Sequence, residues 1–211
     1  YKEGYPMGGY DPYSSSKGCA ELVTSAYRRS FMQEQGIGLA SVRAGNVIGG
    51  GDWADDRLIP DILRFFEKGE SAVIRNPKAT RPWQHVLEPL SGYLVLAQKM
   101  YRDQNKYAEG WNFGPNEQDV KSVDWILNKM IAKWPNSSWE LDSSSNPHEA
   151  NFLQLDISKA ESKLGWKPIW ELSHTLEKII DWHQAWINKE DMQTVCLSEI
   201  KAYMADMNNE V

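Results

Sequence analysis

Alternation of helical and strand-like segments in the first half of the chain constrains its fold more than any other feature. Residues 14–35 are predicted to form the first helix, because apolar side chains recur in it at helical spacing: Ala20, Val23, Ala26, Tyr27 and Phe31. The run LASVRA at 39–44 alternates apolar and small residues, as is typical of a short buried strand. The loop GNVIGGGD at 45–52 follows, and its glycines predict unusual backbone angles or a closely approaching ligand.

The remainder of the chain continues this order. The apolar spacing predicts helices at 58–68, 88–102, 122–133, 158–164, 172–188 and 194–208. It predicts strands at 72–75 and 110–114, an irregular stretch at 76–87, and a polar connector around one candidate strand at 136–149. This order predicts an α/β fold with a helix-rich second subdomain. Three strands are few for so much helix, so we expect the sequence to be a piece of a longer polypeptide.

Composition and charge limit the classes of function. The net charge of -6 argues against a nucleic-acid or anionic-membrane partner, and no apolar run approaches the roughly 20 residues of a membrane span. Cys19 and Cys196 lie far apart, and the four histidines have no metal-ligand spacing, so we predict no disulfide framework and no metal site. With no export signal in the given sequence, we expect a cytoplasmic protein.

Tyr13 and Lys17 form the first candidate for chemistry, because residues four apart share one face of a helix. A neighbouring ammonium lowers the pKa of a phenol, which can then take a proton from an alcohol while hydride leaves the adjacent carbon. The lysine also has donors for a ribose hydroxyl. Alone, this spacing usually marks solvated surface. Small neighbours, which would admit another backbone or a flat cofactor, favour the functional interpretation: Ser14, Ser15, Ser16, Gly18 and Ala20.

Five segments, in chain order, resemble the nucleotide-sugar branch of the extended short-chain dehydrogenase/reductase family. They are PYSSSKGCAE, VRAGNVIGGGD, RPWQHVLEP, WNFGP and LDISKAESKLGWKP. Within that branch, GGYDPYSSSKG, GGGDWADDRLIPDI, RPWQHVLEP and PHEANFLQLD are most similar to the 4,6-dehydratases that act on CDP-glucose. The resemblance extends over nearly the whole chain, to about residue 190.

The resemblance implies a Rossmann-like parallel sheet that binds NAD(P), with NAD the expected form, and a smaller α/β domain that binds a nucleotide-diphosphate sugar. Residues 1–50 would be the C-terminal part of the dinucleotide-binding domain. Residues 51–211 would be mainly the substrate domain, with about 83–113 returning to the Rossmann sheet. The family's glycine-rich phosphate loop is not in this sequence. Neither is the segment before Tyr1 that supplies a threonine beside an acid for water elimination.

The resemblance also implies roles at the cofactor. Tyr13 would remove the proton from the sugar 4-hydroxyl, and Lys17 would lower the pKa of Tyr13 and hold the nicotinamide ribose. Arg43, Ala44 and Val47 would lie beside the cofactor. For Arg43, a buried ion pair is as good an interpretation as a contact with the bound substrate.

Substrate contacts are implied at further positions. Asn46 would bind the diphosphate or sugar, or else stabilise a turn. Arg57 and Arg81 are candidates for the diphosphate, because a guanidinium fork matches phosphate oxygens, with exposed surface arginines as the alternative. Asn112 would touch the phosphates or cap its strand. His148, with Glu149, would line the nucleotide pocket or stay an exposed loop pair. Many relatives have Asp-Trp after the arginine where this chain has Pro82-Trp83, so detailed contacts do not carry over.

The implied reaction is oxidation at C4, loss of water across C5 and C6, and return of hydride to C6. It would yield a 4-keto-6-deoxy sugar nucleotide, a precursor for deoxysugars of bacterial lipopolysaccharide O-antigen. The resemblance also implies a homodimer or dimer of dimers, paired through the helix that carries Tyr13. Two alternatives stay open: a nucleotide-sugar 4-epimerase that shares Tyr13 and Lys17, and a non-catalytic nucleotide-sugar binding module.

Overall fold

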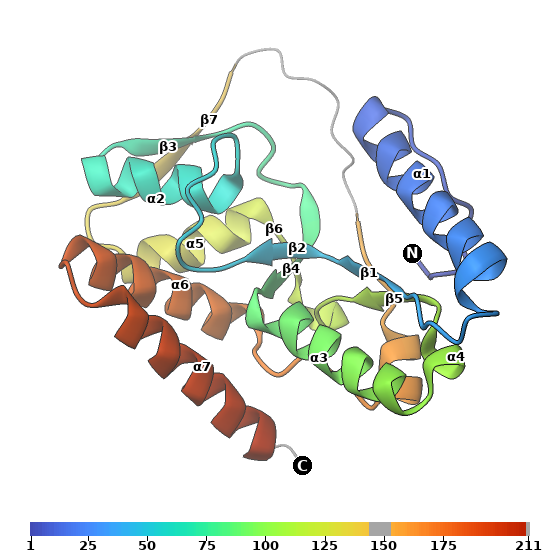
Figure 1. Ribbon diagram of the computed structural model, residues 1–211. Helices are drawn as coiled ribbons and strands as arrows, with labels where there is room; N and C mark the ends of the chain where they lie inside the picture. The colour runs from blue at the N-terminus through green and yellow to red at the C-terminus, as the bar shows by residue number, and fades with distance from the viewer. Residues whose placement is uncertain (144–152, 210–211) are drawn as a thin grey trace. The chain divides into compact units, whose positions relative to one another are not determined.

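The chain passes back and forth between two units in the computed structural model, which describes residues 1–143 and 153–209 (Figure 1). The first unit contains Tyr1–Ala44, Pro89–Gly114 and Leu155–Lys167. The second contains Gly45–Glu88, Pro115–Gln154 and Pro168–Val211. Within the described ranges, no helix has both the length and the apolar character needed to cross a bilayer.

Two parallel strands form the sheet of the first unit. They are β1 (Ser41–Ala44) and β5 (Gly110–Phe113), with Ser41 opposite Gly110 and Ala44 opposite Phe113. Both lie within strands predicted from the sequence, at 39–44 and 110–114. Parallel strands need a long connection between them, which the chain supplies by leaving this unit after Ala44 and returning at Pro89.

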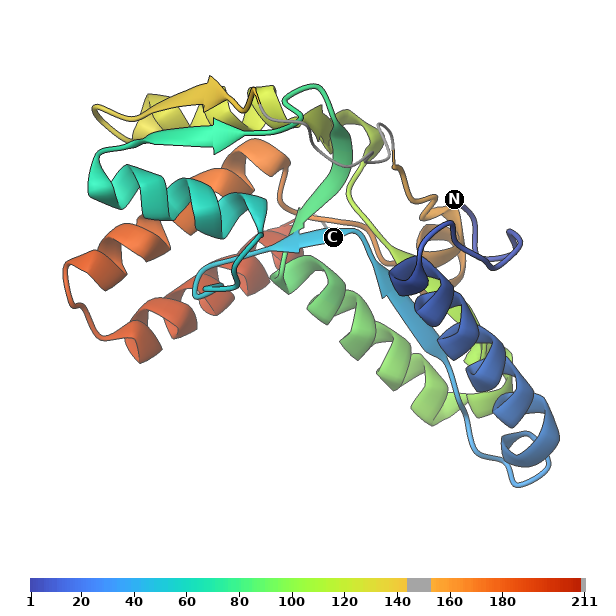
Figure 2. The ribbon, with the colours of Figure 1, turned by 90° about the horizontal axis from the view of Figure 1, so that it is seen from above.

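Helices lie on both faces of this strand pair (Figure 2). One face carries α1 (Pro12–Tyr27), which continues into the π-helical turn η1 (Arg28–Met32). The other carries α3 (Leu87–Arg102, in this unit from Pro89) and the π-helical turn η3 (Ala160–Leu164), while α4 (Gln104–Tyr107) precedes β5. The buried core lies on the α3 side and contains Leu96, Tyr107, Trp111, Phe113, Ile157, Ala160, Leu164 and Trp166.

Helix α1 buries little of its apolar surface within the described structure. Gly18 is its buried residue, whereas four apolar side chains of α1 and η1 are exposed by 52% to 59%: Leu22, Val23, Tyr27 and Phe31. The helix predicted at 14–35 is present as α1 and η1, which begin at Pro12 and end at Met32, and the chain turns away at Gly36 with φ +67°.

In the second unit, β4 (Thr80–His85) is the central strand of three. Its last three residues pair in parallel with β2 (Asn46–Ile48), and its first three pair antiparallel with β6 (Val120–Ser122). A separate parallel pair joins β3 (Ser71–Ile74) to β7 (Ser138–Leu141).

The prediction of an irregular stretch at 76–87 is wrong, because β4 occupies 80–85. Proline lacks the N–H that a strand ladder needs, so RPW reads as a break in a strand. Pro82 is tolerated because β4 changes partner at this point. Pro82 is the last residue of β4 that pairs with β6, opposite Val120, and Trp83 is the first that pairs with β2, opposite Asn46.

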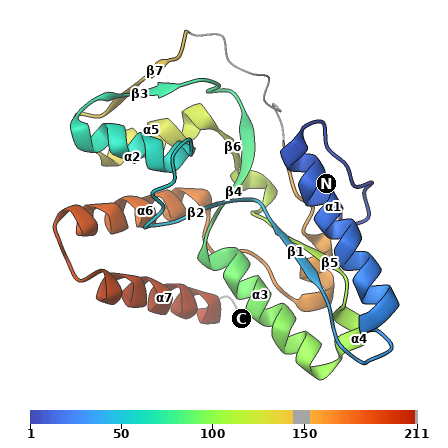
Figure 3. The same ribbon diagram turned by 45° about the horizontal axis from the view of Figure 1, so that its top comes forward.

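Four helices and one short turn complete the second unit: α2 (Leu58–Lys68), the 3-10 turn η2 (Glu117–Asp119), α5 (Val123–Lys133), α6 (Leu172–Ile187) and α7 (Met192–Asn209). The apolar face of α2 is buried, and Gly69 ends the helix at φ +68°. Helices α6 and α7 form a hairpin (Figure 3). The core joins α2, α5 and α6 through Ile59, Ile62, Leu63, Phe66, Ile126, Leu127, Met130, Leu176 and Ile179.

Candidate active site

Tyr13 and Lys17 lie at the beginning of α1, whose start is fixed by its own sequence. Asp11 accepts a hydrogen bond from the backbone N–H of Ser14 at 2.9 Å, and Pro12 suits the first helical position. The Lys17 ammonium lies 5.3 Å from the centroid of the Tyr13 ring. Tyr13 is 68% exposed and Lys17 is exposed as well, so both polar groups are accessible to a ligand.

Small residues bring the loop before α1 against the helix. A Cβ added to Gly18 would come within 3.3 Å of the backbone nitrogen of Gly8. Ser15 Oγ donates a hydrogen bond to the carbonyl of Gly9 at 3.1 Å. On this side of α1, the room that the small residues leave is therefore taken by the backbone of residues 7–9.

Arg43 of β1 directs its guanidinium at Glu21 of α1. Its Nε donates to Glu21 Oε1 and its Nη2 to Glu21 Oε2, both at 2.9 Å, while Ser41 Oγ donates to Oε2 at 2.7 Å. The hydrogen bonds from Arg43 hold the pKa of Glu21 below its ordinary value, against the upward effect of burial. The sequence left an ion pair and a cofactor contact open for Arg43, and the ion pair is present. Sequence reasoning missed Glu21, although it follows Lys17 by four residues.

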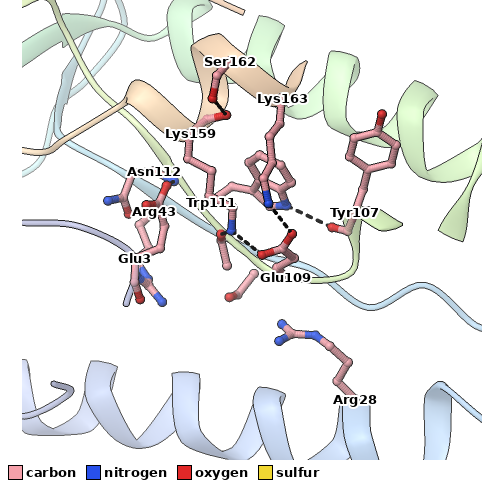
Figure 4. Close-up of polar contacts among 12 residues, drawn as sticks. Glu3, Arg28, Arg43, Tyr107, Glu109, Trp111, Asn112, Lys159, Ser162 and Lys163 are labelled. Carbon is pink, nitrogen blue, oxygen red and sulfur yellow. Dashed lines mark hydrogen bonds and ion pairs between the residues drawn. The ribbon is translucent and has the colours of Figure 1, made fainter. Parts of the chain in front are cut away.

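Asn112 of β5 joins the strand to two other segments of the first unit. It is 1% exposed, and its Nδ2 donates to the carbonyls of Tyr1 at 3.1 Å and Asp156 at 3.3 Å. Its backbone N–H donates to Glu3 Oε1 at 3.0 Å, and Glu3 also accepts from Arg43 through its carbonyl at 3.4 Å (Figure 4). The side-chain nitrogen of Asn112 therefore already donates to two backbone carbonyls.

A lysine pair anchors η3 to the start of β5. Lys159 Nζ lies 2.7 Å from Glu109 Oε2 and 4.4 Å from the centroid of the Trp111 ring, and Lys163 Nζ lies 3.2 Å from Glu109 Oε1 (Figure 4). Trp111 is fully buried and donates its indole N–H to the carbonyl of Tyr107 at 2.9 Å. This cluster holds the segment LDISKAESKLGWKP (155–168) against β5, and the contacts described for it include neither Tyr13 nor Lys17.

The candidate substrate residues of the second unit lie on and after β2 and β4. Asn46 stands opposite Trp83, and Arg81 precedes Trp83 by two residues, so Asn46 and Arg81 lie on one face of the sheet. Arg81 Nη1 donates to the carbonyl of Thr80 at 2.9 Å. Arg57 is exposed and directly precedes α2.

The two remaining cofactor candidates lie on consecutive strands. Ala44 is the last residue of β1, and Val47 is the middle residue of β2 and 38% exposed. His148 and Glu149 lie outside the described residues.

A buried carboxylate of the second unit, Glu88, was not predicted from the sequence. Its oxygens accept the backbone N–H groups of Ile169 at 3.0 Å and Trp170 at 2.7 Å, and the hydroxyl of Tyr203 at 2.7 Å. Burial raises the pKa of Glu88, and these bonds partly offset the effect. Nearby, His85 Nε2 lies 3.1 Å from Glu199 Oε1. These contacts tie α7 to the end of β4, and a single acid in RPWQHVLEP gives no sign of them.

Comparisons with known proteins bear on the identity of this chain. Residues 1–179 match the family described as GDP-mannose 4,6 dehydratase. The CDP-glucose 4,6-dehydratase of Salmonella typhimurium is 59% identical, over 97% of this chain and 59% of its own length.

Solved structures resemble the fold at low identity. A dTDP-glucose 4,6-dehydratase from Bacillus anthracis in complex with NAD has a TM-score of 0.70 at 19% identity, over 87% of this chain and 55% of that one. A UDP-glucuronic acid 4-epimerase from Bacillus cereus in complex with UDP-glucuronic acid and NAD has a TM-score of 0.67 at 19% identity, over 87% and 59%. The likeness confirms the predicted α/β fold of Rossmann-like type. The chain spans between 55% and 59% of the length of these three proteins.

Proposed function

Since the chain belongs to the GDP-mannose 4,6 dehydratase family, we propose that it forms part of an NAD-dependent nucleotide-sugar 4,6-dehydratase that acts on CDP-glucose. The product would be CDP-4-keto-6-deoxyglucose, formed by C4 oxidation, loss of water across C5 and C6, and return of hydride to C6. The observation that carries the proposal is the Tyr13–Lys17 pair at the exposed start of α1, with the ammonium 5.3 Å from the ring centroid.

Tyr13 takes the proton from the 4-hydroxyl in this proposal. In this proposal Lys17, whose ammonium lies 5.3 Å from the centroid of the Tyr13 ring, assists Tyr13 and donates to a ribose hydroxyl. Bound NAD would supply the hydride acceptor at C4 and the hydride donor at C6. The exposed phenol and ammonium fit the ribose end of such a cofactor, and we place the backbone around Ala44 and Val47 beside it.

In this proposal, residues of the second unit bind the nucleotide sugar. Asn46 and Arg81 share one face of β2 and β4, which supports a common role at the diphosphate. We propose that Arg57 also binds the diphosphate and that His148 lines the nucleotide pocket. Because the amide nitrogen of Asn112 is engaged by backbone carbonyls, its contribution is to hold the end of β5 rather than to donate to phosphate.

The wider assignments belong to the same proposal. The first unit would be part of the dinucleotide-binding domain, and the second would carry the nucleotide sugar. The protein would be cytoplasmic and supply deoxysugars for lipopolysaccharide O-antigen. A homodimer or dimer of dimers would cover the apolar side chains that α1 and η1 expose, because apolar surface of this kind is stabilised by burial.

Substitution of Tyr13 tests the proposal in the protein as it occurs naturally. Tyr13→Phe should bind CDP-glucose as wild type does and lose about 10²- to 10⁴-fold in turnover, the usual contribution of a general base. Tyr101→Phe is the matched control, because Tyr101 is 90% exposed and lies on α3. Equal turnover of the two variants would show that Tyr13 is not the base. If the wild-type protein instead forms the CDP-linked 4-epimer, the reaction is epimerisation and not dehydration.

A further inference from the structure

Glu21 is held by a three-bond clamp from β1. Ser41 and Arg43 are alternate residues of that strand, so both side chains face α1. Arg43 binds the carboxylate with two nitrogens and Ser41 binds it with its hydroxyl, so both oxygens are engaged. The Glu21 and Arg43 side chains are 18% and 23% exposed. A bidentate, partly buried pair of this kind is strong and directional.

The clamp acts on the same face of α1 that carries the candidate base. Tyr13, Lys17 and Glu21 follow one another at intervals of four residues, and each step of four turns the direction around the helix by only about 40°. Fixing Glu21 against β1 therefore fixes the rotation of α1 about its axis. The directions in which Tyr13 and Lys17 point follow from that rotation.

The clamp also decides which charge Lys17 meets. A carboxylate four residues from a lysine on a helix is close enough to pair with it. Glu21 has that spacing, yet its oxygens are occupied by Arg43 and Ser41. Within the part of the chain that the structure describes, Lys17 forms no ion pair, and its ammonium lies over the Tyr13 ring.

We propose that Glu21 and Arg43 are positioning residues for the Tyr13–Lys17 pair. They hold the rotation of α1, and they keep the Glu21 carboxylate from neutralising Lys17. Arg43 thus acts through Glu21 and not by contact with the cofactor. The inference rests on the proposed function, since it concerns the same base.

Two variants of the natural, full-length protein separate this role from a merely structural one. In Arg43→Gln, Glu21 keeps its negative charge and can pair with Lys17. Because the Lys17 ammonium then no longer acts on the Tyr13 hydroxyl alone, the apparent pKa of the basic group in the kcat profile should rise by about one unit. At neutral pH, kcat should fall about tenfold while KM stays within about twofold. The double variant Glu21→Gln/Arg43→Gln has neither charge, so the pKa should return to its wild-type value, whereas kcat should stay below wild type because the clamp that holds the rotation of α1 is still missing. Glu34→Gln, which removes an exposed carboxylate just after η1, should change nothing.

Each outcome decides the inference. An unshifted pKa in Arg43→Gln, or no return in the double variant, overturns it. If Arg43→Gln does not fold, Ser41→Ala removes one bond from the clamp and should shift the pKa in the same direction by less; no shift there overturns the inference too. If the wild-type protein leaves CDP-glucose unchanged, the proposed function fails. The clamp is then tested by ultraviolet titration of Tyr13, read as wild type minus Tyr13→Phe, with the same expected shift and return.

Discussion

Removing the hydroxyl of Tyr203 should destabilise the second unit by a predictable amount. Tyr203 is 4% exposed, and its hydroxyl donates to the buried carboxylate of Glu88 at 2.7 Å. Tyr203→Phe keeps the ring and its packing against Trp170, so the change removes mainly the hydrogen bond. A hydrogen bond to a charged group contributes about 1.5–3 kcal/mol. We therefore expect a loss of about 2 kcal/mol, or roughly 30-fold in the folding equilibrium.

Urea unfolding measures this loss directly. The midpoint should fall with the slope m unchanged, because the surface exposed on unfolding stays the same. The control is Tyr101→Phe, whose hydroxyl belongs to a side chain 90% exposed and should change stability by less than about 0.5 kcal/mol. If Tyr203→Phe is as stable as that control, Tyr203 does not hold Glu88, and α7 is not fixed to the end of β4 in the way described.

Two further substitutions test packing and charge. Gly50→Ala should lower the free energy of unfolding by about 1–3 kcal/mol, because a Cβ there would lie 2.2 Å from Trp182 Cγ. Gly4→Ala is the control and should be neutral, because a Cβ there has no atom within 4 Å. Equal urea midpoints for the two variants would contradict the close packing of Gly50 on Trp182. Glu21→Gln should lower stability at neutral pH, and the difference from wild type should shrink as pH falls through the depressed pKa of Glu21, because a carboxylate with a lowered folded pKa stabilises only while it is ionised. If the two proteins still differ in stability at acid pH, the ionised form of Glu21 is not the source of the stabilisation.

Local patterns in the sequence predicted the elements that carry their own signals. The helix at 58–68 has a buried stripe and a glycine at its end, and its predicted bounds coincide with those of α2. The start of α1 was predicted two residues too late, at Ser14, because the cap formed by Asp11 and Ser14 and the favourable first position of Pro12 were not recognised in the sequence. The family was also predicted, because five short segments stand in the right order.

Long-range pairing was harder to predict. β4 carries a proline and becomes a strand only because β2 and β6 supply partners on either side of it. Arg43 meets a carboxylate 22 residues earlier in the chain, and Glu88 meets a hydroxyl 115 residues later. No local periodicity reports such contacts, so the sequence suggested Arg43 as a ligand contact as readily as an ion pair and gave no role to Glu88.

Transfer of an isotope label tests the central claim most directly. The natural, full-length protein would be given CDP-glucose carrying deuterium at C4, and the product would be examined by mass spectrometry and nuclear magnetic resonance. The account predicts the loss of one water, a ketone at C4 and the deuterium at C6, with this transfer almost abolished in Tyr13→Phe. A product that keeps all its oxygens and carries deuterium at C4 with inverted configuration, or unchanged CDP-glucose, would contradict it.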